Sequence, residues 1–132
     1  MDLGEDVLAT VTHFNDVFNQ KDVEAMMGMM TDDVVFENTS GGCFEGQAAV
    51  RSVLDRAFQV MSTGWFETEE IMALGDRAVV LWSYALDKEH PDRGHVRGVD
   101  IFRVRHDRVA EKLSYVKSEE FVQKLGLQLP SS

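Results

Sequence analysis

The sequence predicts a single α+β domain in which three helices are followed by a curved antiparallel sheet. Apolar residues recur at helical spacing as far as Met61, and from Trp65 onward they alternate as they do in strands. The 132 residues contain no repeat, no low-complexity segment and no internal linker, and this length suits one hydrophobic core. Helices first and strands afterwards is an order expected of an α+β fold, so we assign residues 1–132 to one domain.

Three helices are predicted in the first half of the chain. The first covers residues 5–20, where apolar side chains recur every three or four positions. Asp22 is the expected N-cap of a short second helix over residues 23–30, whose methionines we expect to fill an irregular core. The third helix covers residues 47–61. Between the second and third helices we expect a short strand at 34–38 and a flexible loop at 39–44, which contains two glycines.

Four long strands are predicted in the second half. They cover residues 65–74, 78–87, 95–105 and 108–117. Turns at Gly75-Asp76 and His106-Asp107 separate neighbouring strands, and a polar loop separates the second strand from the third. After them, Ser118 is the expected N-cap of a short C-terminal helix.

Several of these strands are apolar on both faces, as at residues 79–82 and 99–102. A sheet with one face on its own helices and the other in water should alternate cleanly between apolar and polar residues. Apolar residues on the second face suggest that this face is covered as well. We therefore predict a homodimer through the outer face of the sheet.

The charge balance argues against several classes of partner. Thirteen basic and 23 acidic residues give a formal net charge of −10. A surface this negative repels phosphate backbones and anionic membranes, so we expect neither nucleic acid nor membrane as a partner. No apolar run is long enough to span a bilayer, and the acidic start lacks the pattern of a signal peptide. A cytoplasmic location is expected.

The cysteine and histidine content argues against a metal site. Cys43 is the only cysteine, so the chain can form neither an internal disulfide nor a cysteine-based metal site, and we expect Cys43 in a loop. The four histidines do not have metal-ligand spacing. We therefore expect no metal and no cofactor.

Several short motifs, taken in their order and spacing, resemble the nuclear transport factor 2-like superfamily. They are FNQKDVEA at 18–25, TDDVVF at 31–36, EG at 45–46, GVDIFR at 98–103 and RVAEK at 108–112. Within this superfamily the chain is most similar to SnoaL-like and ketosteroid-isomerase-like members. The resemblance implies a sheet that curls around the three helices into a cone, whose open end admits a small apolar ligand. Because the fold hosts many unrelated chemistries, the resemblance does not fix a reaction.

The isomerase mechanism of this superfamily needs a carboxylate base and two donors to an enolate oxygen. The resemblance places these roles at Asn38, Phe14 and Asp100 respectively. Only Asp100 has the required chemistry, because asparagine takes no proton at neutral pH and phenylalanine has no hydroxyl. Steroid isomerase activity is therefore not expected. Glu37 is a minor alternative base, which would need a bulge to turn inward.

The epoxide hydrolase residue set is incomplete as well. The resemblance places its asparagine at Asn38, but its tyrosine position is Phe36. Its arginine and two aspartates fall on Tyr84, Leu86 and Ser114. The acid–base groups of that mechanism are missing.

Asp100 is the candidate catalytic residue, and its neighbours in the strand are apolar. A carboxyl group in such surroundings is either protonated or paired, and Lys112 is the expected partner. If the turn at residues 106–107 is made by a three-residue loop with a bulge, Lys112 lies opposite Asp100 on the same face. A two-residue loop would place Leu113 there and turn Lys112 outward. The sequence leaves both registers open, and it equally leaves open a purely structural role for Asp100.

The remaining pocket residues follow from strand alternation and the resemblance. Trp82 and Tyr84 alternate onto one face, which the resemblance implies is the inner one, where they either line the cavity or simply pack. The full predicted ligand pocket consists of Phe14, Phe36, Asn38, Trp82, Tyr84, Phe102, Lys112 and Ser114.

Two hypotheses about function follow. In the first, the protein binds a small hydrophobic molecule in an interior cavity and acts as a cofactor-independent isomerase, cyclase or hydrolase with Asp100 as acid or base. In the second, it is a non-catalytic ligand-binding or dimeric assembly domain of the same fold. The missing base at Asn38 favours the second hypothesis, and the interior acid favours the first.

Overall fold

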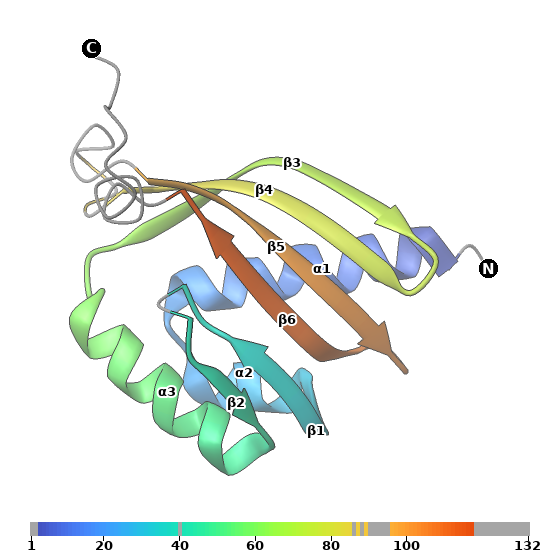
Figure 1. Cartoon of the computed structure of the whole chain (residues 1–132), viewed down its shortest axis with the longest axis horizontal. Coiled ribbons are helices and arrows are strands. Elements are labelled where there is room, and N and C mark those ends of the chain that lie inside the picture. The colour runs from blue at the N-terminus through green and yellow to red at the C-terminus, as the bar shows by residue number, and fades with distance from the viewer. Residues whose placement is uncertain (1–2, 40, 86, 88, 90–95, 118–132) are drawn as a thin grey trace, which may run out of the picture.

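Three helices and a six-stranded sheet make up the described part of the chain (Figure 1). The structure is a computed structural model and describes residues 3–39, 41–85, 87, 89 and 96–117. The helices are α1 (Leu3–Gln20), α2 (Val23–Gly28) and α3 (Gln47–Val60). The strands are β1 (Met30–Glu37), β2 (Cys43–Glu45), β3 (Trp65–Leu74), β4 (Arg77–Ala85), β5 (Val96–Arg105) and β6 (Arg108–Val116). The predicted α+β class is confirmed, whereas the predicted C-terminal helix lies outside the described residues.

The strands lie in the order β2-β1-β6-β5-β4-β3, so β6 at the end of the described chain lies inside the sheet beside β1. All neighbouring strands are antiparallel except β1 and β6, which are parallel. The sheet is curved and does not close (Figure 1). The sheet is therefore mixed, whereas the sequence predicts a wholly antiparallel one. Parallel neighbours need a long connection, and the chain supplies one between β1 and β6 through α3 and three further strands.

β1 and β2 differ most from the predicted pattern. β1 begins at Met30 rather than at residue 34, because α2 already ends at Gly28. β2 begins inside the predicted loop at 39–44 and ends one residue beyond it, and Cys43 on this strand pairs with Glu37 of β1. A strand of three residues is too short for an alternating pattern to show in the sequence.

The core lies between the sheet and α1, which runs across one face of β3–β6 (Figure 1). Phe14 of α1 is fully buried and meets the ring of Phe102 edge-on, with 5.6 Å between ring centres. Met26, Met27 and Met30 are buried too, which confirms that these methionines fill the core. No described helix covers the opposite face of the sheet (Figure 1).

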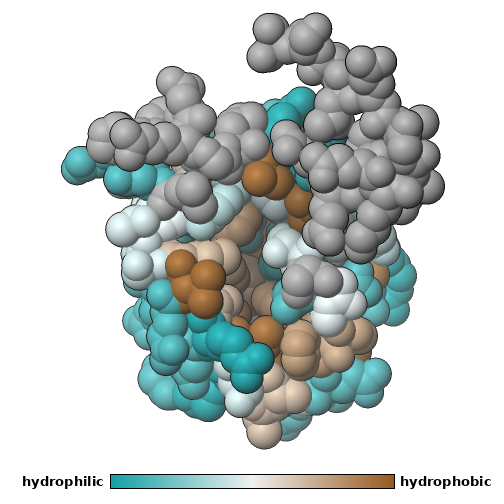
Figure 2. Space-filling model, turned by 60° about the vertical axis from the view of Figure 1, so that its left-hand side comes forward, coloured by the Kyte–Doolittle hydropathy of each residue, from teal (hydrophilic) through white to brown (hydrophobic). Residues whose placement is uncertain are grey.

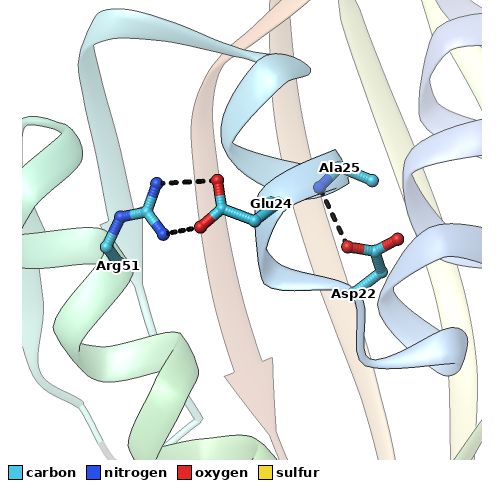
Figure 3. Close-up of polar contacts among 4 residues, drawn as sticks. All are labelled: Asp22, Glu24, Ala25 and Arg51. Atoms are coloured by element: carbon cyan, nitrogen blue, oxygen red, sulfur yellow. Dashed lines mark hydrogen bonds and ion pairs between the residues drawn. The ribbon is translucent and has the colours of Figure 1, made fainter.

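The short helix α2 is held by a cap at its start and by an ion pair to α3 (Figure 3). The side chain of Asp22 accepts a hydrogen bond of 3.1 Å from the backbone N–H of Ala25, which confirms the predicted N-cap. Glu24 in the first turn forms a bidentate ion pair with Arg51 of α3. The hydrogen bonds from Arg51 lower the pKa of the Glu24 carboxyl. Because this pair is exposed to water, it adds little stability.

The turn between β5 and β6 contains two residues, and a bulge follows it on β6. His106 and Asp107 have φ angles of 52° and 59°, as both central residues of a type I′ turn do. Val104 then pairs with Val109, but the preceding residue of β5 pairs with Glu111. Ala110 is therefore the extra residue of a β-bulge.

The bulge turns Lys112 toward the helices. Beyond it, Lys112 pairs with Phe102, and Ser114 pairs with Asp100. Both registers considered from the sequence are therefore wrong in detail, since the loop has only two residues and Lys112 nevertheless faces inward. An extra residue within the strand reverses the alternation of side chains just as a longer loop would.

Candidate functional site

A cavity of about 110 Å³ lies between the inner face of the sheet and helices α1 and α3. Figure 2 shows a hollow on this side of the molecule with apolar side chains around it. An engineered protein cavity of about 150 Å³ binds benzene, so the cavity is comparable in size to a single ring. The described residues that line it are Asn15, Phe18, Phe36, Asn38, Thr39, Val53, Leu54, Ala57, Met61, Phe66, Thr68, Val80, Trp82, Asp100 and Lys112.

Part of the cavity wall is aromatic. The ring of Phe66 meets the rings of Phe18 and Trp82 edge-on, at 5.4 Å and 4.9 Å between ring centres. Gly98 on β5 lies opposite Trp82, and a Cβ atom there would lie 2.3 Å from the indole. Glycine at this position therefore leaves the space that the indole fills.

A buried ion pair interrupts the apolar wall. Asp100 and Lys112 are each 7% exposed, and Nζ of Lys112 lies 3.4 Å from Oδ2 of Asp100. The same Nζ donates a hydrogen bond of 2.8 Å to Oγ of Ser114 and lies 4.6 Å from the centre of the Phe36 ring. The expected partner of Asp100 is thus present, and its ammonium compensates the charge of the carboxylate.

Two buried polar atoms of the cavity residues make no hydrogen bond within the described part of the chain. They are Oδ1 of Asp100 and Nε1 of Trp82. A buried donor or acceptor without a partner costs about 1–3 kcal/mol, so such atoms are expected to meet water or a ligand. One atom is an acceptor and the other a donor.

Asn38, which lines the cavity, also has a structural role. Its Oδ1 accepts a hydrogen bond of 2.9 Å from the N–H of Gly42, and its own backbone N–H donates to the carbonyl of Gly42 at 2.9 Å. These bonds close the turn between β1 and β2. The side-chain oxygen that would occupy the place of a catalytic base is therefore engaged with the backbone, which agrees with the absence of the isomerase residue set.

Five of the residues predicted from the sequence line one cavity. Asp100, Phe36, Asn38, Trp82 and Lys112 come from four different strands or their ends, and the curved sheet brings them together. Their common inward orientation follows from the alternation of β4 and β5 and from the bulge in β6.

The other four predicted residues are not among the described lining residues. Phe14 and Phe102 are fully buried in the core between α1 and the sheet, and Ser114 is tied to the site through its hydrogen bond to the ammonium. Tyr84 packs beside the cavity, its ring 4.7 Å from that of a lining phenylalanine. Burial raises the pKa of the Tyr84 hydroxyl.

The sequence did not indicate the contributions of α1 and α3 to the cavity. Asn15 and Phe18 of α1 line it, so the helix presents the face next to Phe14 rather than Phe14 itself. Thr68 of β3 was also missed. The apolar stripe of α3 was visible in the sequence, but its spacing alone does not distinguish a cavity wall from a packed core.

Two further findings concern metals and membranes. Histidine, cysteine, aspartate and glutamate do not gather in groups of three or more that could hold a metal ion, as far as the structure describes the chain. Among the described helices, none combines the length and the hydrophobicity that crossing a bilayer requires.

Comparison with known proteins identifies the family. The model of the SnoaL-like domain matches residues 11–112, which is most of the chain. The chain belongs to the SnoaL-like domain family. An NTF2-like protein of unknown function from Mesorhizobium loti is 31% identical, with a TM-score of 0.74 over 89% of this chain and 96% of that one. Among curated proteins, none matches the sequence.

Two more distant structures share the fold of this SnoaL-like domain. An LEH-like epoxide hydrolase from M. tuberculosis is 20% identical, with a TM-score of 0.69 over 94% of this chain and 90% of that one. TerC, co-crystallised with polyporic acid, is 18% identical, with a TM-score of 0.73 over 89% of this chain and 96% of that one. At these identities the likeness shows the fold alone.

Proposed function

We propose that this SnoaL-like domain binds a small, mainly apolar molecule of about one ring in its cavity, with the polar group of the ligand at Asp100. The observation that carries the proposal is a buried ion pair in an otherwise apolar, aromatic cavity, with one carboxylate oxygen unpaired among the described residues. Such a cavity with a few convergent polar groups is a typical small-molecule site. The complex of TerC with polyporic acid supports it, because a protein of the same fold holds a small molecule.

Asp100 is the residue through which a reaction in this cavity would proceed. Its Oδ2 faces the ammonium of Lys112, and its Oδ1 is left to accept a proton or a hydrogen bond from the ligand. The nearby ammonium would stabilise negative charge that develops on a ligand oxygen. This arrangement supports cofactor-independent proton transfer, as in an isomerase, cyclase or hydrolase.

Ligand titration tests this function. Toluene and benzyl alcohol are suitable probes, because they share one ring and differ by a hydroxyl. Binding is followed by the fluorescence of Trp82 in the Trp65→Phe background. We expect saturable binding of both probes, and tighter binding of benzyl alcohol through Oδ1 of Asp100. Asp100→Asn should weaken the binding of benzyl alcohol about tenfold, since a hydrogen bond to a charged group is worth about 1.5–3 kcal/mol. It should change the binding of toluene little.

The exposed Asp16 of α1 provides a matched control. Asp16→Asn makes the same chemical change outside the cavity and should leave both affinities unchanged. A fluorescence signal that does not saturate with either probe would contradict the proposed function.

A second candidate function is assembly through the outer face of the sheet, and we propose a homodimer formed there. Residues that pair across the strands form two apolar rows on this face. The first crosses β3–β6 and contains Met72, Val79, Ile101 and Leu113; the second crosses β4–β6 and contains Leu81, Val99 and Tyr115. A hollow lined in part by this second row lies on the same face.

Charged rows flank the apolar rows on both sides. One contains Arg77, Arg103 and Glu111, and Arg97 lies on the other with its ion-pair partner Glu69. A face that carries both signs around an apolar centre can complement a second copy of itself across a two-fold axis. This symmetry favours a homodimer over an unrelated partner.

A further inference from the structure

We propose that Lys112 captures small aldehydes and ketones covalently, as an imine at its Nζ. This inference rests on the proposed function, because the carbonyl compound would occupy the same cavity. The bond would make the site selective for carbonyl compounds among apolar molecules of one ring. It also assigns the ammonium of the buried pair a part in chemistry, beyond compensating a charge.

The surroundings of Lys112 are those of a reactive lysine rather than a surface one. Its Nζ lies in the cavity wall between the rings of Phe36 and Phe18, 4.6 Å and 5.9 Å from their centres. Lysines enclosed by apolar groups are the ones that proteins use to form Schiff bases. By contrast, the ammonium of Lys21 donates hydrogen bonds to two backbone carbonyls, and Lys117 is exposed.

Asp100 is placed to move the protons that the reaction requires. Transfer of one proton from Nζ of Lys112 to Oδ2 of Asp100, over 3.4 Å, gives a neutral amine and a carboxylic acid. The nitrogen lone pair attacks the carbonyl carbon, so a C–N bond forms while the C=O π bond breaks. The oxygen takes the proton of Asp100, and the nitrogen returns one to it, which leaves a neutral carbinolamine.

The second step releases water and restores the ion pair. The nitrogen lone pair forms the C=N bond, and the C–O bond breaks as the leaving hydroxyl takes the proton held by Asp100. The products are one water molecule and an iminium ion beside the Asp100 carboxylate. Overall, an ammonium and a carbonyl compound become an iminium and water, so no redox partner is needed.

The burial of the pair favours this particular chemistry. The wall holds one positive and one negative charge both before and after the reaction, so the product leaves no uncompensated charge in the apolar cavity. Oδ1 of Asp100, unpaired among the described residues, can accept a hydrogen bond from the carbinolamine hydroxyl or from the released water. The hydrogen bond of 2.8 Å to Ser114 fixes the direction of Nζ.

Reductive trapping of the full chain tests the inference. The protein is incubated with benzaldehyde and cyanoborohydride, and the modified lysine is identified by peptide mass mapping. We expect labelling of Lys112 at least about tenfold faster than that of Lys117, because the cavity raises the local concentration of the aldehyde. Excess toluene, which cannot react, should suppress labelling at Lys112 and leave Lys117 unaffected.

Two variants separate the roles of the pair. Lys112→Arg keeps the positive charge and should abolish labelling at this position, while Asp100→Asn keeps the amine and should slow labelling about tenfold by removing the proton carrier. In the control variant Asp16→Asn, Lys112 should be labelled as fast as in the wild type. If toluene and benzaldehyde both bind by Trp82 fluorescence but Lys112 labels no faster than Lys117, the inference is wrong and the proposed function stands. If neither probe binds, both fail.

Discussion

At the scale of single residues, the Asp100–Lys112 pair places two charges in a wall that is otherwise apolar. Both residues are only 7% exposed, so neither charge has much contact with water. Removing one partner leaves the other charge buried and uncompensated, whereas replacing both by apolar residues of similar size is often neutral or stabilising. The stability of the fold should therefore depend on the pair as a unit.

A pair of variants tests this dependence. We expect Asp100→Leu to lower the free energy of unfolding by about 3–5 kcal/mol, because Lys112 loses its counter-charge. The double variant Asp100→Leu/Lys112→Met should lie close to the wild type. Urea denaturation followed by circular dichroism measures both. A double variant as unstable as Asp100→Leu would show that packing rather than charge determines the loss.

Tyr84 predicts a loss of stability at alkaline pH. Burial raises the pKa of its hydroxyl above the ordinary value of 10.0, so the folded protein holds this proton at a pH where the unfolded chain releases it. Stability then falls as pH rises from about 10 toward the raised value. Tyr84→Phe has no proton to lose at this position. Urea denaturation at pH 8 and at pH 10.5 should show a smaller alkaline loss for Tyr84→Phe than for the wild type, and equal losses would contradict the prediction.

Single residues also show how far the site could be predicted from the sequence. Asp100 was identifiable because a carboxylate stands out in an apolar strand. Asn15 was not, because it lies only one position from Phe14 on α1, and the periodicity of a helix does not tell which structure its faces meet. The core position and the cavity position differ by only about 100° around the helix.

At the scale of elements, Asn19 near the end of α1 fixes the start of β3. Its Nδ2 donates to the carbonyl of Phe66 at 2.8 Å, and its Oδ1 accepts from the N–H of the same residue at 2.9 Å. Lys21 adds a hydrogen bond of 2.8 Å to the carbonyl of Gly64, just before the strand. Because Phe66 lines the cavity, this clamp also positions part of the aromatic wall.

Removing the clamp should destabilise the fold. Asn19→Ala leaves two backbone groups of Phe66 without partners, and we expect a loss of about 2 kcal/mol in the free energy of unfolding. Gln20→Ala removes an exposed amide side chain from the same helix and should change stability by less than about 0.5 kcal/mol. Urea denaturation compares the two variants. Equal, small losses would mean that water replaces the clamp.

The sequence predicts the positions of most helices and strands better than it predicts how the strands pair. α1, α3 and β3–β6 follow from local periodicity and were placed within a few residues. The parallel pairing of β1 with β6 involves residues far apart in the chain, and no local pattern encodes it. The bulge at Ala110 is likewise invisible, since it depends on how β6 fits against β5. Yet that bulge decides that Lys112 faces the cavity.

At the scale of the whole molecule, the outer face of the sheet and the net charge act in opposite directions. The two apolar rows on this face favour contact with another copy, and Tyr115 within them is 53% exposed. Two copies that each carry a charge of −10 repel one another. Burial of the apolar rows must therefore outweigh this repulsion if the proposed dimer forms. Salt screens the repulsion but hardly affects apolar burial, so the dimer should be more stable at higher ionic strength.

Sedimentation of two matched variants tests the dimer. We expect the wild type at micromolar concentration to have twice the mass of the 14.9 kDa chain. Val99→Glu places a charge in the middle of the apolar rows and should give the monomer mass. Val60→Glu makes the same substitution on α3, where the side chain is 80% exposed, and should leave the dimer intact. Circular dichroism checks that both variants remain folded. A wild type that sediments as a monomer would exclude the dimer, and a loss of dimer in both variants would point to net charge rather than to this face.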